Sequence, residues 1–164
     1  MFTKIIFNYP PISISLIYFH LDPTCRAPNP PTALFNRMCT NLAEIVWEGS
    51  DGTLVDPVFS AKYGAIIILS SDYARNHFYT MDVPKDFADD VFYSYPCKID
   101  GRIYVVPQRD DLEMNAACQV VAIGDDLDKV IAEVKDRASK IEGHQIRYDE
   151  SALDSALTDF KKSF

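Results

Sequence analysis

Short apolar runs along the chain predict several strands. Runs of strand length, rich in β-branched and aromatic side chains, occupy 12–21 (ISISLIYFHL), 65–71 (AIIILSS) and 118–123 (CQVVAI). Two more runs, 91–99 and 102–106, are joined by Asp100-Gly101, a pair that is typical of the tight turn in a β-hairpin. We therefore expect a sheet that includes a hairpin.

Helical spacing is clearest in the second half of the chain. One apolar stripe recurs there at Leu127, Val130, Ile131, Val134, Ala138 and Ile141. Acid-before-base pairs four residues apart, Glu133–Arg137 and Asp136–Lys140, lie on its polar face. We expect Gly143 to end this helix, a strand to return over 144–148, and a last helix to begin at Ser151.

An earlier helix is predicted after the proline-rich stretch 27–31. Thr32 caps it and Gly49 lies near its end, and the stripe consists of Leu34, Met38, Leu42 and Ile45. The resulting order is strand, helix, several strands, helix, strand, helix. This order predicts an α+β fold, with one mixed or antiparallel sheet and helices mainly on one face.

Composition narrows the classes of function. A formal net charge of −8, a pI of about 4.7 and scattered basic residues argue against binding of a nucleic-acid backbone. Because no stretch of about 20 apolar residues occurs, we expect no membrane span and a cytoplasmic location. The four cysteines lack zinc-ligand spacing, and we favour free thiols over two disulfides for Cys25, Cys39, Cys97 and Cys118.

Candidate catalytic residues are few. The sequence contains no nucleophile elbow, no HExxH zinc motif and no phosphate-binding P-loop. His20, His77 and His144 are far apart, and we interpret each as a structural or surface residue. Acid pairs at 89–90, 110–111 and 125–126 fit a solvated turn or helix start about as well as they fit a metal site.

The segment Asp22-Pro23-Thr24-Cys25-Arg26 stands apart because it follows the apolar run 12–21 directly. Alternate residues of an extended segment project to one face, which would bring a carboxylate, a hydroxyl and a guanidinium together. Oxygen ligands suit Mg²⁺, and arginine suits phosphate charge. The same residues after a strand are also common as a simple turn.

The strand followed by Asp22-x-Thr24-x-Arg26 resembles the Glu-x-Asn-x-Arg segment near the end of the ATP-grasp fold. The resemblance is closest to carboxylate–amine ligases of the phosphoribosylamine–glycine ligase (glycinamide ribonucleotide synthetase) type. Downstream, 41–47 (NLAEIVW) resembles the helix after that motif. Residues 120–125 (VVAIGD), the helix over 127–141 and Glu142-Gly143-His144 then resemble the C-terminal subdomain. On this basis 16–164 is the ATP-grasp C-terminal segment with that subdomain, and 1–15 is an unassigned N-terminal arm.

The resemblance implies an ADP-forming ligase reaction. ATP phosphorylates a carboxylate, and an amine then displaces phosphate from the acyl phosphate to form an amide. By position, Asp22 and Thr24 would bind Mg²⁺, and Arg26 would be catalytic, contacting phosphate or the carboxylate substrate. Asp22 is one methylene shorter than the family's Glu, and Thr24 offers a hydroxyl where the family has an amide oxygen.

The family's upstream half, with its glycine-rich lid, adenine-binding strand and phosphate-binding lysines, has no counterpart in this sequence. We therefore expect a truncated C-terminal fragment that is inactive alone. Its partners would be an N-terminal ATP-grasp half or a second copy that covers an exposed apolar surface. The alternative is a stand-alone small-molecule-binding or regulatory domain derived from an ATP-grasp tail. We find no constellation that supports a complete enzyme of unrelated chemistry.

Overall fold

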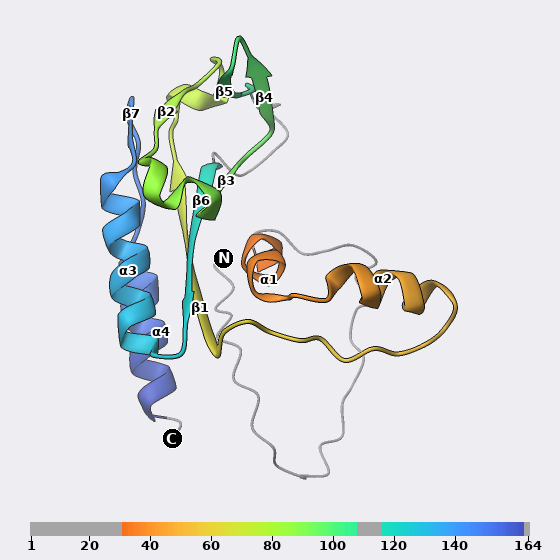
Figure 1. The fold of residues 1–164 in the computed structure, drawn as a ribbon. Helices are drawn as coiled ribbons and strands as arrows, with labels where there is room; N and C mark the ends of the chain where they lie inside the picture. Colours follow the sequence, from red (N-terminus) through yellow and green to blue (C-terminus); the bar gives the residue numbers. More distant parts are fainter. Residues whose placement is uncertain (1–30, 108–115, 163–164) are drawn as a thin grey trace.

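The computed structural model describes residues 31–107 and 116–162, which form an α+β fold (Figure 1). The helices are α1 (Pro31–Met38), α2 (Leu42–Ser50), α3 (Leu127–Lys140) and α4 (Ser151–Lys162), with short 3₁₀ turns η1 (Tyr73–Arg75) and η2 (Lys85–Asp90). The strands are β1 (Tyr63–Ser70), β2 (Met81–Asp82), β3 (Val91–Tyr93), β4 (Pro96–Ile99), β5 (Arg102–Val105), β6 (Ala116–Gly124) and β7 (Glu142–Gly143). The predicted strand 12–21 and the N-terminal arm 1–15 lie outside the described residues.

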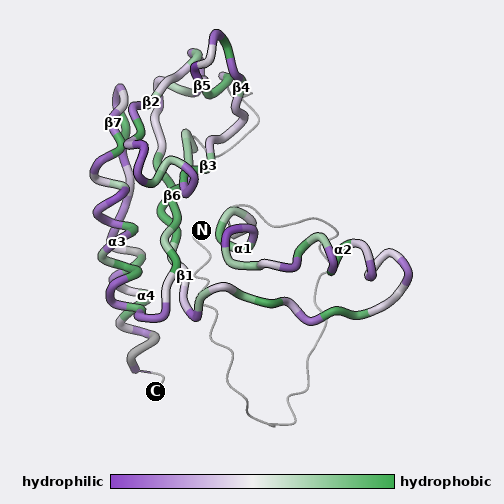
Figure 2. Tube along the Cα trace, viewed as in Figure 1, coloured by the Kyte–Doolittle hydropathy of each residue, from purple (hydrophilic) through white to green (hydrophobic). Residues whose placement is uncertain are grey.

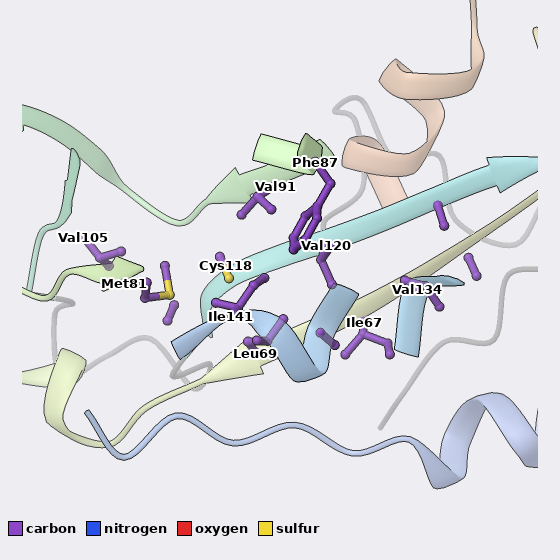
Figure 3. Close-up of a cluster of buried hydrophobic side chains, with 14 of the residues drawn as sticks. Ile67, Leu69, Met81, Phe87, Val91, Val105, Cys118, Val120, Val134 and Ile141 are labelled. Carbon is purple, nitrogen blue, oxygen red and sulfur yellow. The ribbon is translucent and has the colours of Figure 1, made fainter. Parts of the chain in front are cut away.

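The central sheet is antiparallel, in the order β1-β6-β3. Successive side chains of a strand point to opposite faces, so each face has its own core. Ile67, Val120 and Val134 lie together between the sheet and α3 (Figure 3). On the other face, α1 packs Leu34 against Val121. The helices therefore cover both faces, and the expectation that they lie mainly on one face needs this correction.

Helix α3 has the residues and the polar pairs that its sequence predicts. The Asp126 side chain accepts a hydrogen bond from the Lys129 backbone N–H at 3.2 Å, which satisfies one of the unpaired donors at the helix start. Both acid-before-base pairs form, with nitrogen–oxygen distances of 2.6 Å in each. Four apolar residues of the stripe are buried against the sheet: Val130, Ile131, Val134 and Ala138.

The hairpin around Asp100-Gly101 is confirmed. Ile99 pairs with Arg102, and the two turn residues have positive φ angles of 49° and 81°, as a two-residue type I′ turn requires. The long run 91–99 nevertheless divides, because Tyr95 has a φ of 44° and ends the extended backbone. As a result, β3 joins the central sheet and β4 pairs only with β5.

Two other predicted elements are wrong in extent. The strand over 144–148 is absent, because Gln145 has a φ of 54°, and the pairing is confined to β7 against β2 and one bridge from Arg147. The single helix from Thr32 to Gly49 is interrupted at 39–41. There the Asn41 side chain bonds to backbone groups of Asp56 and Val58 at 3.0 and 2.8 Å. These partners compete with helix continuation.

Candidate functional site

The residues that the sequence singles out for chemistry, Asp22, Thr24 and Arg26, lie outside the described residues, as does His20. Within 31–107 and 116–162, no group of three or more His, Cys, Asp or Glu side chains could hold a metal ion. The acid pair 125–126 instead makes structural bonds, because Asp125 accepts from the Lys62 backbone N–H at 3.0 Å and Asp126 caps α3. The described part of the chain has a different group of polar side chains at the end of β1.

The end of β1 brings together two imidazoles that are far apart in the sequence. Tyr73, in η1, stacks on His77 with ring centroids 4.1 Å apart and an interplanar angle of 8°. His144 meets the same ring edge-on at 4.8 Å and 82°. We call Tyr73, His77 and His144 the histidine–tyrosine cluster. All three side chains are exposed, so water and a dissolved ligand can reach them.

The tautomer of His77 follows from its hydrogen bond. Its Nδ1 lies 3.1 Å from the Tyr73 carbonyl oxygen, and a carbonyl can only accept, so Nδ1 carries the proton. In the neutral ring Nε2 is then the basic nitrogen. In the cluster, Nε2 of the exposed His77 ring is therefore the nitrogen that can accept a proton.

Beneath this cluster lies Tyr79, whose side chain is only 2% exposed. Its Oη makes no hydrogen bond with the described part of the chain. Burial raises the pKa of the Tyr79 phenol; the nearby Ser71 hydroxyl opposes that rise, and Cys118 adds to it. Ser71 itself donates to the His144 carbonyl at 2.9 Å, which ties the end of β1 to the turn after β7. The buried phenol ring therefore packs against the cluster through Tyr73, with the two ring centroids 6.5 Å apart.

A second polar group lies at the other edge of the sheet, where the Asp90 carboxylate meets two arginines. Arg137 Nη1 is 2.9 Å from Asp90 Oδ2 and donates to the Val121 carbonyl oxygen at 2.6 Å. Arg37 of α1 pairs with the other carboxylate oxygen. Since β3 starts at Val91, paired with Val120, no strand of the described residues pairs with the Val121 carbonyl on that side. The arginine replaces that partner, so we interpret the Asp90 group as a structural link between α1, β6 and α3.

The comparisons with known proteins give likenesses among solved structures alone. No family model matches the chain, and no curated protein matches it. Among solved structures, phosphoribosylamine–glycine ligase from Thermotoga maritima is similar over 66% of this chain and 26% of the ligase chain, with 14% sequence identity and a TM-score of 0.47. This chain therefore spans about a quarter of that enzyme's length. Likeness of this extent establishes neither family membership nor an activity.

Sequence reasoning did not anticipate the histidine–tyrosine cluster. His77 and His144 belong to different elements, and no local spacing joins them. The described residues also contain no helix that is long and apolar enough to cross a membrane.

Proposed function

We propose that the chain is the C-terminal part of an ADP-forming carboxylate–amine ligase of the ATP-grasp type, whose nucleotide-binding half is supplied from outside these 164 residues. The observation that carries the proposal is the order of the segments: an apolar run, Asp22-x-Thr24-x-Arg26, and then the downstream segments in the family's order. The described downstream segments support it. Residues 42–50 form a helix, β6 ends at Gly124, and α3 follows within three residues.

In this proposal Asp22 and Thr24 would hold Mg²⁺ and Arg26 would bind anionic oxygens of phosphate or of the carboxylate substrate. A carboxylate and a hydroxyl are hard oxygen donors, which suit Mg²⁺. The ion would supply neutralisation of phosphate charge when ATP is bound. A planar guanidinium at Arg26 would grip two oxygens at once and so orient the group that it binds.

The decisive assay is trapping of the acyl phosphate. This chain, an N-terminal half of a phosphoribosylamine–glycine ligase, and their mixture are each given Mg-ATP, a panel of small carboxylates and hydroxylamine. We expect hydroxamate only from the mixture, with its loss in Arg26→Ala and its retention in the control Arg102→Ala, which changes an exposed arginine of β5. Absence of hydroxamate from the mixture for every carboxylate would contradict the proposal.

Thermal unfolding tests whether the chain needs its partner. We expect Mg-ATP at millimolar concentration to leave the melting temperature of the chain alone unchanged. A complete site with a Kd a hundredfold below the ligand concentration would add about 2.7 kcal/mol. For a domain of this size that stabilisation is a rise of about 5–10 °C. Such a rise, abolished by Asp22→Ala, would show a self-sufficient nucleotide site within these 164 residues and overturn the proposal that the nucleotide-binding half lies outside them.

The histidine–tyrosine cluster favours the alternative function, a stand-alone small-molecule-binding domain. An exposed aromatic ring flanked by two exposed imidazoles offers stacking, and imidazole hydrogen bonds, to a planar or anionic ligand. Binding there would shift the His77 and His144 ring protons in NMR spectra taken with a metabolite mixture. We expect Tyr73→Ala to remove such shifts. Shifts that survive this substitution would place the ligand elsewhere.

A further inference from the structure

Residues 31–60, which include α1 and α2, form a unit whose two ends are bonded to each other. The Thr40 backbone N–H donates to the Val58 carbonyl at 2.8 Å, and the Ser60 N–H donates to the Met38 carbonyl at 2.9 Å. The chain thus returns to the end of α1 before it enters β1. We call 31–60 the α1–α2 unit; it lies on one side of the central sheet, and α3 lies on the other (Figure 1).

The α1–α2 unit covers its face of the sheet through a core that is separate from the one under α3. Strands β1 and β6 are hydrophobic where α1 lies beside them (Figure 2). Within the described residues, the buried members of this core are Ala33, Leu34, Met38 and Val121, and its partly buried members are Phe59, Ile66, Phe92 and Ile123. The core on the α3 face is several times larger in the same part of the chain. Since stabilisation grows with the apolar area buried, less free energy should hold α1 on the sheet than holds α3.

The ion pair between the unit and the rest of the fold can break without leaving a buried charge unpaired. Arg37 of α1 pairs with one oxygen of Asp90, while Arg137 of α3 lies 2.9 Å from the other. Arg137 also donates to the Val121 carbonyl, so that group keeps its partner when α1 leaves. Loss of a sole partner is what makes breaking a buried ion pair expensive. The second arginine therefore lowers the cost of separating α1 from the sheet.

The chain that joins the unit to β1 provides a hinge. Ser60 is bonded to the end of α1, as described above, and the Lys62 backbone N–H donates to Oδ1 of Asp125 at 3.0 Å on the sheet side. Ala61 lies between these two bonds. Hinges in proteins consist of a few such residues that absorb a change in backbone dihedral angles. Rotation about Ala61 would carry the unit away from the sheet with the bonds on both sides intact.

We propose that the α1–α2 unit is a hinged cover, which opens from the sheet as one body while β1, β6 and α3 stay folded. Opening uncovers the apolar sheet face at Ile66, Val121 and Ile123. The strands keep their pairing and the α3 core in the open form. An eight-residue helix without packing is unstable in water, so α1 unfolds once the cover is open. Exchange of the unit's amide protons therefore reports the opening.

Native-state hydrogen exchange of the full chain tests the proposal, with each amide followed by NMR at urea concentrations below the unfolding transition. We expect the N–H groups of Cys39, Thr40 and Ser60 to share one opening equilibrium. The open form should be at least tenfold more populated than the form through which β6 and α3 exchange. Exchange of the unit should also depend weakly on urea, because its opening exposes less surface than global unfolding does.

Two variants separate opening of the unit from global unfolding. Ile131→Val trims a side chain in the α3 core, which persists in the open form. The amides of β6 and α3 should then exchange about fivefold faster, while those of the unit keep their rates. Arg37→Gln removes a contact that both processes lose, so both sets should accelerate by the same factor, at least twofold.

Three results would each overturn the proposal. The first is equal protection of the unit and of β6, which would show that α1 leaves the sheet only in global unfolding. The second is acceleration of the unit's amides by Ile131→Val, which has the same meaning. The third is unequal protection of Thr40 and Ser60, which would show that the ends of α1 fray locally and that 31–60 does not open as one body.

Discussion

Replacing Arg137 by methionine removes the charged group that joins α3 to the edge of the central sheet. Its side chain is 16% exposed, and that of its partner Asp90 is 13% exposed, so this ion pair is largely shielded from water. The same guanidinium donates to the Val121 carbonyl at 2.6 Å and lies 5.7 Å from the centre of the Phe87 ring. Methionine keeps much of the side chain's length while losing all of these polar interactions.

The expected loss of stability can be built from those contacts. A hydrogen bond from a charged donor is worth about 1.5–3 kcal/mol, and the Val121 carbonyl would lose it in a buried position. Removing one partner of a buried ion pair costs about 3–5 kcal/mol, but Asp90 keeps Arg37, whose half-exposed side chain moderates that cost. We therefore expect Arg137→Met to lower the free energy of unfolding by about 3 kcal/mol.

A double-mutant cycle in urea provides the assay. Asp90→Asn alone should cost about 1–2 kcal/mol, and the double variant Arg137→Met/Asp90→Asn should cost at least about 1 kcal/mol less than the sum of the single changes. The matched control is Glu133→Gln, which removes the other carboxylate on Arg137. Because Glu133 is 46% exposed, that change should cost under about 0.5 kcal/mol. Equal costs for Arg137→Met and Glu133→Gln, or strict additivity in the cycle, would refute the structural role of the Asp90 group.

Three further predictions concern close packing and a buried thiol. Gly143→Ala would place its Cβ 2.2 Å from Oη of Tyr79, so we expect the free energy of unfolding, measured in urea, to fall by about 2 kcal/mol. In a Tyr79→Phe background, which lacks that hydroxyl, we expect the loss to be at most half as large. Gly64→Ala would place its Cβ 2.6 Å from Leu34 Cδ1, and because that methyl can shift we expect a smaller loss, about 1 kcal/mol, with faster amide exchange in α1. Burial raises the pKa of Cys118 to about 12, so iodoacetamide at pH 8 should leave this thiol unmodified in the folded protein, as checked by mass spectrometry. The pKa of this thiol is thus higher in the folded chain than its ordinary value of 9.0, which applies to the unfolded chain. The contribution of the thiol to the free energy of unfolding is therefore fully present below pH 9 and declines as the pH rises toward 12. Cys118→Ala should reduce this decline.

The elements that the sequence predicts well are those whose cause is local. Helix α3 follows from its own stripe and from Asp126 at its start, and the hairpin follows from two turn residues that tolerate positive φ. The interruption of the first predicted helix has a distant cause, since Asn41 bonds to backbone groups of the segment ending at Val58. The meeting of His77 and His144 on Tyr73 likewise depends on tertiary contacts that no window of sequence contains.

Helix α2 shows what an apolar stripe at helical spacing does not predict. Leu34 and Met38 of the predicted stripe are buried under α1, whereas Leu42 and Ile45 of the same stripe are only half-buried on α2. Periodicity reports that one side of a helix is apolar, but it carries no information on whether that side packs within the chain or against another chain. A pattern typical of a core-facing helix and a structure that leaves α2 without a buried residue are both accounted for if the packing partner of α2 lies outside 31–107 and 116–162. The emission of Trp47 distinguishes the two cases, because packing within the chain is independent of protein concentration and packing between copies is not.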